Sequence, residues 1–116
     1  MRPRTPFRRI DTRTAEALFS RSDLVVLDAR DAASFEQSHI NGARPVSSAN
    51  LATVINATAK TRPILIYCYH GNTSRELSQI FSDFGFTEFY SLDGGYQAWF
   101  ARVAVGGAPF NSASAP

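Results

Sequence analysis

Two short, uninterrupted apolar runs constrain the fold more than any other feature of the sequence. Residues 24–27 read LVVL and lead into Asp28, and residues 64–67 read ILIY and lead into Cys68. Such β-branched and aromatic runs are typical of strands that are buried on both faces, as in a parallel sheet. Residues 88–92 (EFYSL) indicate a third strand. The sequence therefore predicts a mostly parallel sheet that is covered on both sides.

Amphipathic stretches lie between these runs and predict helices. Asp11 or Thr12 can cap a first helix, Asp31 begins a second, and Ser47 or Ser48 can cap a third over residues 51–55. Because strands and helices alternate along the chain, the pattern predicts an α/β fold.

Two further helices are predicted in the second half of the chain. The first has an apolar stripe and a glycine C-cap, formed by Leu77, Ile80, Phe81, Phe84 and Gly85. The second begins near Gly95 and holds Tyr96, Trp99 and Phe100. In this reading Asp93-Gly94-Gly95 is a turn that leads into the helix, and Trp99 anchors it in the core.

The length of 116 residues fits one domain with an ordinary apolar content of 44%. We expect a basic arm over residues 1–9, a folded domain over residues 10–104 and a small, polar tail over residues 105–116. The arm contains four arginines, namely Arg2, Arg4, Arg8 and Arg9.

Several functional classes are not favoured by the composition. A net charge of +2 is too small to indicate nucleic-acid binding, and no apolar run approaches the ~20 residues of a membrane span. No apolar segment of a signal peptide follows the N-terminal arginines. One cysteine gives no disulfide framework, and together with His39 and His70 it shows no metal-ligand spacing. We therefore expect a cytoplasmic protein without a metal site.

Cys68 is the candidate for chemistry, because it lies where a buried strand meets a polar loop and then a helix. Ligands of open α/β sheets bind beyond the carboxyl ends of strands. Amides of a tight loop and a helix N-terminus can stabilise a thiolate, which is the nucleophilic form of cysteine. The alternative is a buried structural thiol.

Two residues after Cys68 could also take part in the chemistry. His70 could assist proton transfer or be a surface residue. Arg75 could reach an anionic substrate or be an exposed helix residue.

Asp28 and Arg30 stand at the end of the first predicted strand, near the predicted site. They could line that site. The more favoured reading is a structural ion pair, or a cap near Asp31.

Four ordered segments, within residues 10–99, resemble the rhodanese family and most closely its single-domain thiosulfate sulfurtransferases. They are LDARD (27–31), HINGA (39–43), CYHGNTS (68–74) and DGGYQAW (93–99). The resemblance implies a rhodanese-like fold with a mostly parallel sheet of about five strands and helices on both faces. One departure is Arg44-Pro45-Val46, where the family often has an apolar residue before the proline.

The resemblance also implies an activity and its site. Cys68 is expected to take sulfur from thiosulfate as a persulfide and to pass it on in a ping-pong reaction. Cyanide, a small thiol or a thioredoxin-like protein is expected to accept the sulfur, with no cofactor. The expected substrate-binding residues follow Cys68 in the loop: Tyr69, His70, Gly71, Asn72, Thr73, Ser74 and Arg75.

Two alternatives stay open. A phosphatase of the same fold would need an arginine six residues after the cysteine, where it could hold phosphate bidentately. That position is Ser74, and Arg75 comes one residue later. The other alternative is a non-catalytic binding or regulatory module, a class in which the cysteine is often lost.

Overall fold

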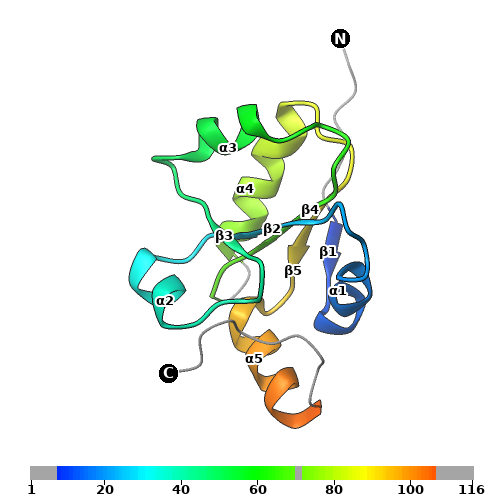
Figure 1. The fold of residues 1–116 in the computed structure, drawn as a ribbon, viewed down its shortest axis with the longest axis vertical. Helices are drawn as coiled ribbons and strands as arrows, with labels where there is room; N and C mark the ends of the chain where they lie inside the picture. The colour runs from blue at the N-terminus through cyan, green and yellow to red at the C-terminus, as the bar shows by residue number, and fades with distance from the viewer. Residues whose placement is uncertain (1–7, 70–71, 107–116) are drawn as a thin grey trace.

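A computed structural model of the chain describes residues 8–69 and 72–106, without the side chains of 72–76, 78 and 103–106. Five strands form one sheet in the order β1-β5-β4-β2-β3, and every neighbouring pair is parallel. The predicted parallel α/β sheet is confirmed (Figure 1). The strands are β1 (Arg8–Ile10), β2 (Val25–Asp28), β3 (Arg44–Pro45), β4 (Ile64–Tyr67) and β5 (Phe89–Leu92).

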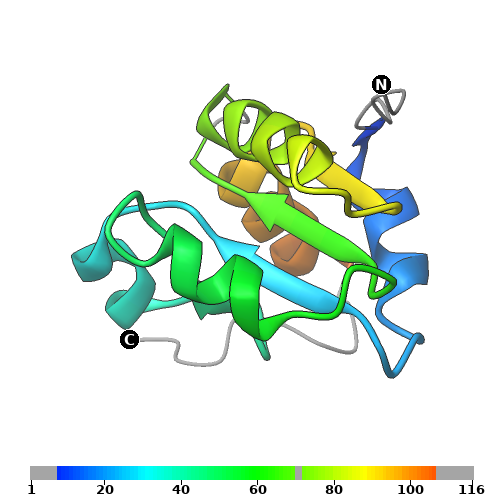
Figure 2. The same ribbon diagram turned by 90° about the horizontal axis from the view of Figure 1, so that it is seen from above.

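Helices cover both faces of this sheet (Figures 1 and 2). One core cluster joins the sheet to the first and last helices and to Phe35, and a second cluster joins its other face to the third and fourth helices. The helices are α1 (Thr12–Leu18), α2 (Ala32–Gln37), α3 (Leu51–Ala57), α4 (Asn72–Asp83) and α5 (Gly95–Gly106).

The central strand β4 shows why the apolar runs are continuous. Leu65 and Tyr67 belong to the cluster on one face, whereas Ile64 and Ile66 belong to the cluster on the other. Successive side chains of a strand point to opposite faces, so a strand covered on both sides is apolar at every position. All four of these residues have no exposed surface.

Two of the three predicted helix caps are confirmed. Asp11 accepts a hydrogen bond from the Thr14 backbone N–H at 2.8 Å, and Asp31 accepts one from the Ser34 backbone N–H at 3.1 Å. The prediction of Ser47 or Ser48 as the cap of α3 is wrong. Asn50 occupies that position without a side-chain capping bond.

The Ser47 hydroxyl instead accepts from the Ala49 N–H, because the chain makes a turn before α3 begins.

The end of α4 is predicted correctly except for one side chain. Gly85 follows the helix in the left-handed region at φ 91°, which suits a glycine C-cap. Phe84, which the apolar stripe placed inward, is 55% exposed instead. Phe84 lies between the last helical residue, Asp83, and the turn at Gly85, so it stands at the open end of the helix.

The two edge strands were not predicted from the sequence. Arg8 and Arg9 form β1 with Ile10, so these two arginines belong to the sheet and not to an arm that precedes it. β3 is only two residues long, and its Pro45 is tolerated because the strand lies at a sheet edge.

The described secondary structure extends slightly beyond residues 10–104 at both ends. The sheet begins at Arg8, before the expected boundary at residue 10, and α5 extends to Gly106, past residue 104. Arg2 and Arg4, and the expected tail from residue 107 onward, lie outside the described residues.

A buried polar network joins the ends of β2 and β4. Asp28 is fully buried and accepts hydrogen bonds from the Arg30 guanidinium at 2.7 Å and from the Tyr67 hydroxyl at 2.7 Å. The same hydroxyl accepts a bond from the Ile40 backbone N–H at 3.1 Å. Burial, and then the charge of Asp28, raise the pKa of Tyr67, which keeps the hydroxyl protonated as a donor. The residue just before Cys68 is thereby fixed.

A tight turn connects β5 to α5 and packs against the chain that follows β4. Gly95 adopts φ 59°, and a methyl group in its place would collide with the Cys68 carbonyl oxygen and lie 2.6 Å from the Tyr69 carbonyl carbon. Only glycine permits this backbone angle together with this close approach. Gly95, the second glycine of the DGGYQAW segment, therefore allows α5 to contact the chain that follows β4.

We expect Tyr67→Phe to lower the free energy of unfolding by about 1–3 kcal/mol, because it removes one partner of a buried carboxylate and the acceptor of a buried N–H. Tyr90→Phe is the matched control, since the Tyr90 hydroxyl donates to the less buried Glu88 at 2.6 Å. Urea unfolding of both variants measures the difference. An equal or larger loss for Tyr90→Phe would show that the Asp28 network contributes no more than a partly buried hydrogen bond.

We expect Gly95→Ala to destabilise the fold more than Gly42→Ala. Both glycines have positive φ, at 59° and 87°, but a methyl group at Gly42 would meet nothing within 4 Å. Gly42→Ala therefore has only the backbone strain of about 1–2 kcal/mol, whereas Gly95→Ala adds a clash with Cys68. Urea unfolding and amide chemical-shift changes at Cys68 measure both effects. Similar stabilities and unshifted Cys68 signals in the two variants would contradict this account of the turn.

Candidate functional site

The carboxyl ends of the parallel strands share one edge of the sheet, and Cys68 lies at the centre of that edge. It directly follows β4, which stands between β5 and β2 in the strand order. Its residue is only 5% exposed. The predicted position at a strand end is confirmed, and the thiol lies recessed in the surface.

The N-terminal turn of α5 holds the backbone around Cys68. The Tyr96 N–H donates to the Cys68 carbonyl oxygen at 2.7 Å, and the Gln97 N–H donates to the Tyr69 carbonyl oxygen at 3.4 Å. In a trans peptide the N–H points opposite to the C=O. The Tyr69 N–H therefore points away from α5, which orients the first amide of the loop.

The structure describes the predicted loop residues only in part. Tyr69 is 52% exposed, and His70 and Gly71 lie outside the described residues. The backbone of residues 72–75 forms the first turn of α4, so this helix begins four residues after Cys68. The side chains of Asn72, Thr73, Ser74 and Arg75 lie outside the described part.

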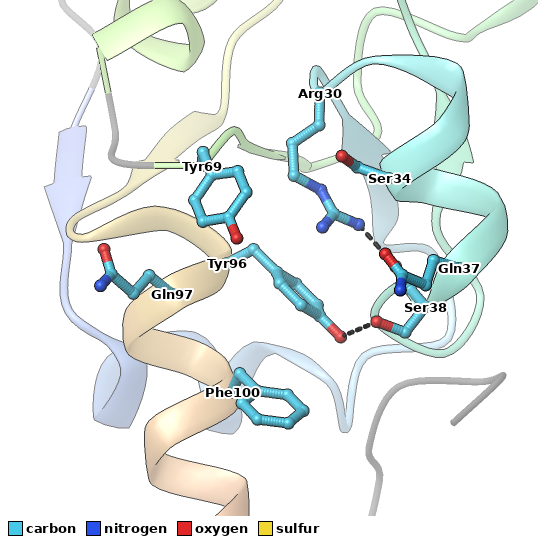
Figure 3. A pocket seen from close by; sticks show the side chains of 8 residues that line it. All are labelled: Arg30, Ser34, Gln37, Ser38, Tyr69, Tyr96, Gln97 and Phe100. Carbon is cyan, nitrogen blue, oxygen red and sulfur yellow. Dashed lines mark hydrogen bonds between the residues drawn. The ribbon is translucent and has the colours of Figure 1, made fainter. Parts of the chain in front are cut away.

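A pocket of about 320 Å³ adjoins Tyr69 (Figure 3). Ser34, Gln37 and Ser38 line it from α2 and the residue after that helix. Tyr96, Gln97 and Phe100 line it from α5. Arg30 and Tyr69 complete the wall, with the guanidinium of Arg30 between the two helices.

Arg30 forms a buried ion pair with Asp28 and also lines the pocket. Its Nε and one terminal nitrogen bind Asp28, and the same terminal nitrogen donates to the Ser38 carbonyl oxygen at 2.6 Å. The guanidinium carbon lies 4.0 Å from the centre of the Tyr96 ring. Burial lowers the pKa of Arg30, but the hydrogen bonds and charge of Asp28 outweigh it, and the net shift is upward. The predicted ion pair is confirmed, and Arg30 also lines the pocket.

The HINGA segment has structural roles at the described positions. His39 stacks on Phe35 with ring centres 4.0 Å apart, and its Nδ1 lies 2.7 Å from the Phe35 carbonyl oxygen. Ile40 is fully buried, and Gly42 turns the chain at φ 87°. The Ile40 N–H reaches the Tyr67 hydroxyl, so this segment supports the strand that ends at Cys68.

Sequence reasoning missed most of the pocket. Ser34, Gln37 and Ser38 carry no local pattern that distinguishes them from ordinary surface residues. Phe100 was expected only as part of a helix, yet it is 55% exposed at the pocket. Trp99 is 1% exposed, which confirms it as a core residue.

Within the described residues, no group of three or more His, Cys, Asp or Glu side chains could hold a metal ion. No helix in the described part of the chain is long and apolar enough to cross a membrane.

Comparisons with known proteins agree with this architecture. The family model of the rhodanese-like domain matches residues 11–102. Thiosulfate sulfurtransferase GlpE of Coxiella burnetii (strain RSA 331 / Henzerling II) is 38% identical over 83% of this chain and 90% of the relative. Its counterpart from Pseudomonas fluorescens (strain SBW25) is 39% identical over 80% and 84%.

A solved structure from Rhodopseudomonas palustris, described as a protein of unknown function and a possible tyrosine phosphatase, is also similar. It is 25% identical with a TM-score of 0.72, covering 90% of this chain and 84% of its own. The family model, the relatives of more than 30% identity and the parallel sheet agree, and the chain belongs to the rhodanese-like domain family.

Proposed function

We propose that the chain is a thiosulfate sulfurtransferase that carries sulfur on Cys68. The observation that supports this most directly is the place of Cys68, recessed at the carboxyl end of the central strand and four residues before α4. The positive end of a helix dipole favours a thiolate. The names of the relatives, thiosulfate sulfurtransferases from two bacteria, point to the same reaction.

The reaction has two balanced steps. The Cys68 thiolate attacks the outer sulfur of thiosulfate, the S–S bond of thiosulfate breaks, and sulfite leaves with the electron pair. A nucleophilic acceptor, such as cyanide or a thiolate, then attacks the outer sulfur of the Cys68 persulfide. The persulfide bond breaks, and the Cys68 thiolate is regenerated. No net oxidation of the enzyme occurs.

The loop after Cys68 supplies the anion site in this proposal. The backbone amides from Tyr69 to Ser74, including those of His70, Gly71, Asn72 and Thr73, surround the outer sulfur and stabilise its charge. The orientation of the Tyr69 N–H away from α5 supports this arrangement. Arg75 attracts the anionic donor. A catalytic thiol needs a reducing environment, which is consistent with the cytoplasm.

Intact-protein mass spectrometry after thiosulfate treatment tests the proposal. We expect the mass of one sulfur atom to be gained by the wild-type chain and lost again on addition of cyanide. Since Cys68 is the only cysteine, Cys68→Ala should gain no sulfur and should show no turnover from thiosulfate to cyanide. Its thermal melting serves as the control that the fold is intact. A wild-type chain that never gains sulfur would refute the carrier role and favour a non-catalytic module.

Phosphatase chemistry is the second candidate, because the Rhodopseudomonas palustris structure is described as a possible tyrosine phosphatase. Ser74 argues against it, since it occupies the position where phosphate would need a bidentate arginine. We expect no hydrolysis of an aryl phosphate by the wild-type chain. Hydrolysis that is lost in Cys68→Ser would reverse the choice between the two functions.

A further inference from the structure

Tyr96 contacts both the backbone of Cys68 and the end of a neighbouring helix. Its backbone N–H donates to the Cys68 carbonyl oxygen at 2.7 Å, and its hydroxyl group forms a hydrogen bond of 2.8 Å with the Ser38 hydroxyl group (Figure 3). Ser38 directly follows α2, and Tyr96 belongs to the first turn of α5. Tyr96 therefore connects the backbone beside the thiol to the end of α2.

Ser38 is itself held by its backbone groups. Its N–H donates to the Ser34 carbonyl oxygen at 3.2 Å in the C-cap of α2. Its carbonyl oxygen accepts a hydrogen bond from the Arg30 guanidinium at 2.6 Å, and the same guanidinium is bound to the buried Asp28 carboxylate. The Ser38 hydroxyl therefore offers Tyr96 a partner whose position is fixed by the surrounding structure.

The ring of Tyr96 is packed between two other side chains. The Arg30 guanidinium carbon lies 4.0 Å from the ring centre, and the Tyr67 ring stacks with it at 5.9 Å between centres. Tyr96 is only 6% exposed. Tyr96→Phe keeps the ring and these two contacts, and it removes only the hydroxyl group. The contribution of the bond to Ser38 can therefore be measured separately from the packing of the ring.

The backbone bond from Tyr96 sets the orientation of one peptide group beside the thiol. The Cys68 carbonyl and the Tyr69 N–H belong to the same planar peptide unit and point in opposite directions. Because Tyr96 holds the carbonyl oxygen, it also holds the direction of the Tyr69 N–H. In the proposed function this N–H is the first donor of the anion site. Donors of this kind stabilise the charge of a reaction best when they are already oriented before it begins.

We propose that Tyr96 is a positioning residue for sulfur transfer and that its bond to the Ser38 hydroxyl keeps it in place. The inference rests on the proposed function of Cys68. In the loading step, the Cys68 sulfur bonds to the outer sulfur of thiosulfate while the thiosulfate S–S bond breaks and sulfite leaves with the electron pair. Neither hydroxyl group touches thiosulfate. Both act through the peptide unit between Cys68 and Tyr69.

The test measures how fast the full chain takes up sulfur from excess thiosulfate when no acceptor is present, by the release of sulfite. We expect Tyr96→Phe and Ser38→Ala each to lower the maximal loading rate about fivefold, because the peptide unit is no longer held as firmly. The thiosulfate concentration at half-maximal rate should change less than about twofold, since neither hydroxyl group binds the donor. Rates are measured well below the melting temperature of each variant, so that only folded protein contributes.

Three further variants separate positioning from stability. Ser38→Thr keeps a hydroxyl group, and the extended backbone of Ser38 suits a β-branched residue, so it should load at the wild-type rate. Tyr90→Phe is the matched control, because Tyr90 is 7% exposed and its hydroxyl donates to Glu88 at the amino end of β5. It should also load normally. The double variant Tyr96→Phe/Ser38→Ala should be no slower than either single variant, since both changes remove the same bond.

NMR signals of the peptide unit report its orientation without any reaction. We expect Ser38→Ala to shift the Cys68 carbonyl-carbon signal and the Tyr69 amide signals, although Ser38 contacts them only through Tyr96. Ser38→Thr and Tyr90→Phe should leave these signals in place. A structural role of the hydroxyl pair that does not extend to Cys68 would lower the melting temperature and leave both signals unshifted.

The outcomes separate the two levels of the proposal. Failure of the wild-type chain to load sulfur would refute the proposed function, and the positioning role with it. Normal wild-type loading with unchanged rates in Tyr96→Phe and Ser38→Ala would refute the positioning role alone. Equal slowing in Tyr90→Phe, or effects of the two single changes that multiply in the double variant, would also refute it.

Discussion

The buried ion pair between Asp28 and Arg30 is the interaction on which the edge of the sheet depends. Asp28 has no exposed surface, so its charge is tolerated only because Arg30 and Tyr67 both donate to it. Each donor comes from a different segment, the loop after β2 and the end of β4. Arg30 extends the connection to the Tyr96 ring of α5. One carboxylate thus fixes the relative positions of three segments around Cys68.

The backbone of Cys68 is held from two sides. Before it, the Tyr67 hydroxyl is tied to Asp28 and to the Ile40 N–H. After it, the first turn of α5 binds the carbonyl oxygens of Cys68 and Tyr69, at a distance that only Gly95 allows. Sites whose supporting residues are themselves fixed keep their geometry during a reaction. The LDARD, HINGA and DGGYQAW segments share this supporting task.

The sequence predicted those parts of the fold that local pattern encodes. Continuous apolar runs identified β2 and β4, and side-chain caps identified the starts of α1 and α2. β1 was missed because Arg8 and Arg9 are exposed on an edge strand and give no apolar signal. The position of Cys68 followed from its strand, whereas the pocket did not follow from any motif. Its walls come from α2 and α5, which are far apart in sequence and meet only through the fold.

The recessed position of Cys68 has a consequence for how sulfur would leave the protein. A cysteine residue that is only 5% exposed is shielded from bulky disulfides, so mixed disulfides with the resting protein are disfavoured. A persulfide adds an S–S bond of about 2.05 Å beyond the cysteine sulfur. The transferred sulfur atom would then lie farther out than the cysteine sulfur. In the proposed function, an acceptor would therefore meet the transferred sulfur atom first, and the cysteine sulfur would stay behind it.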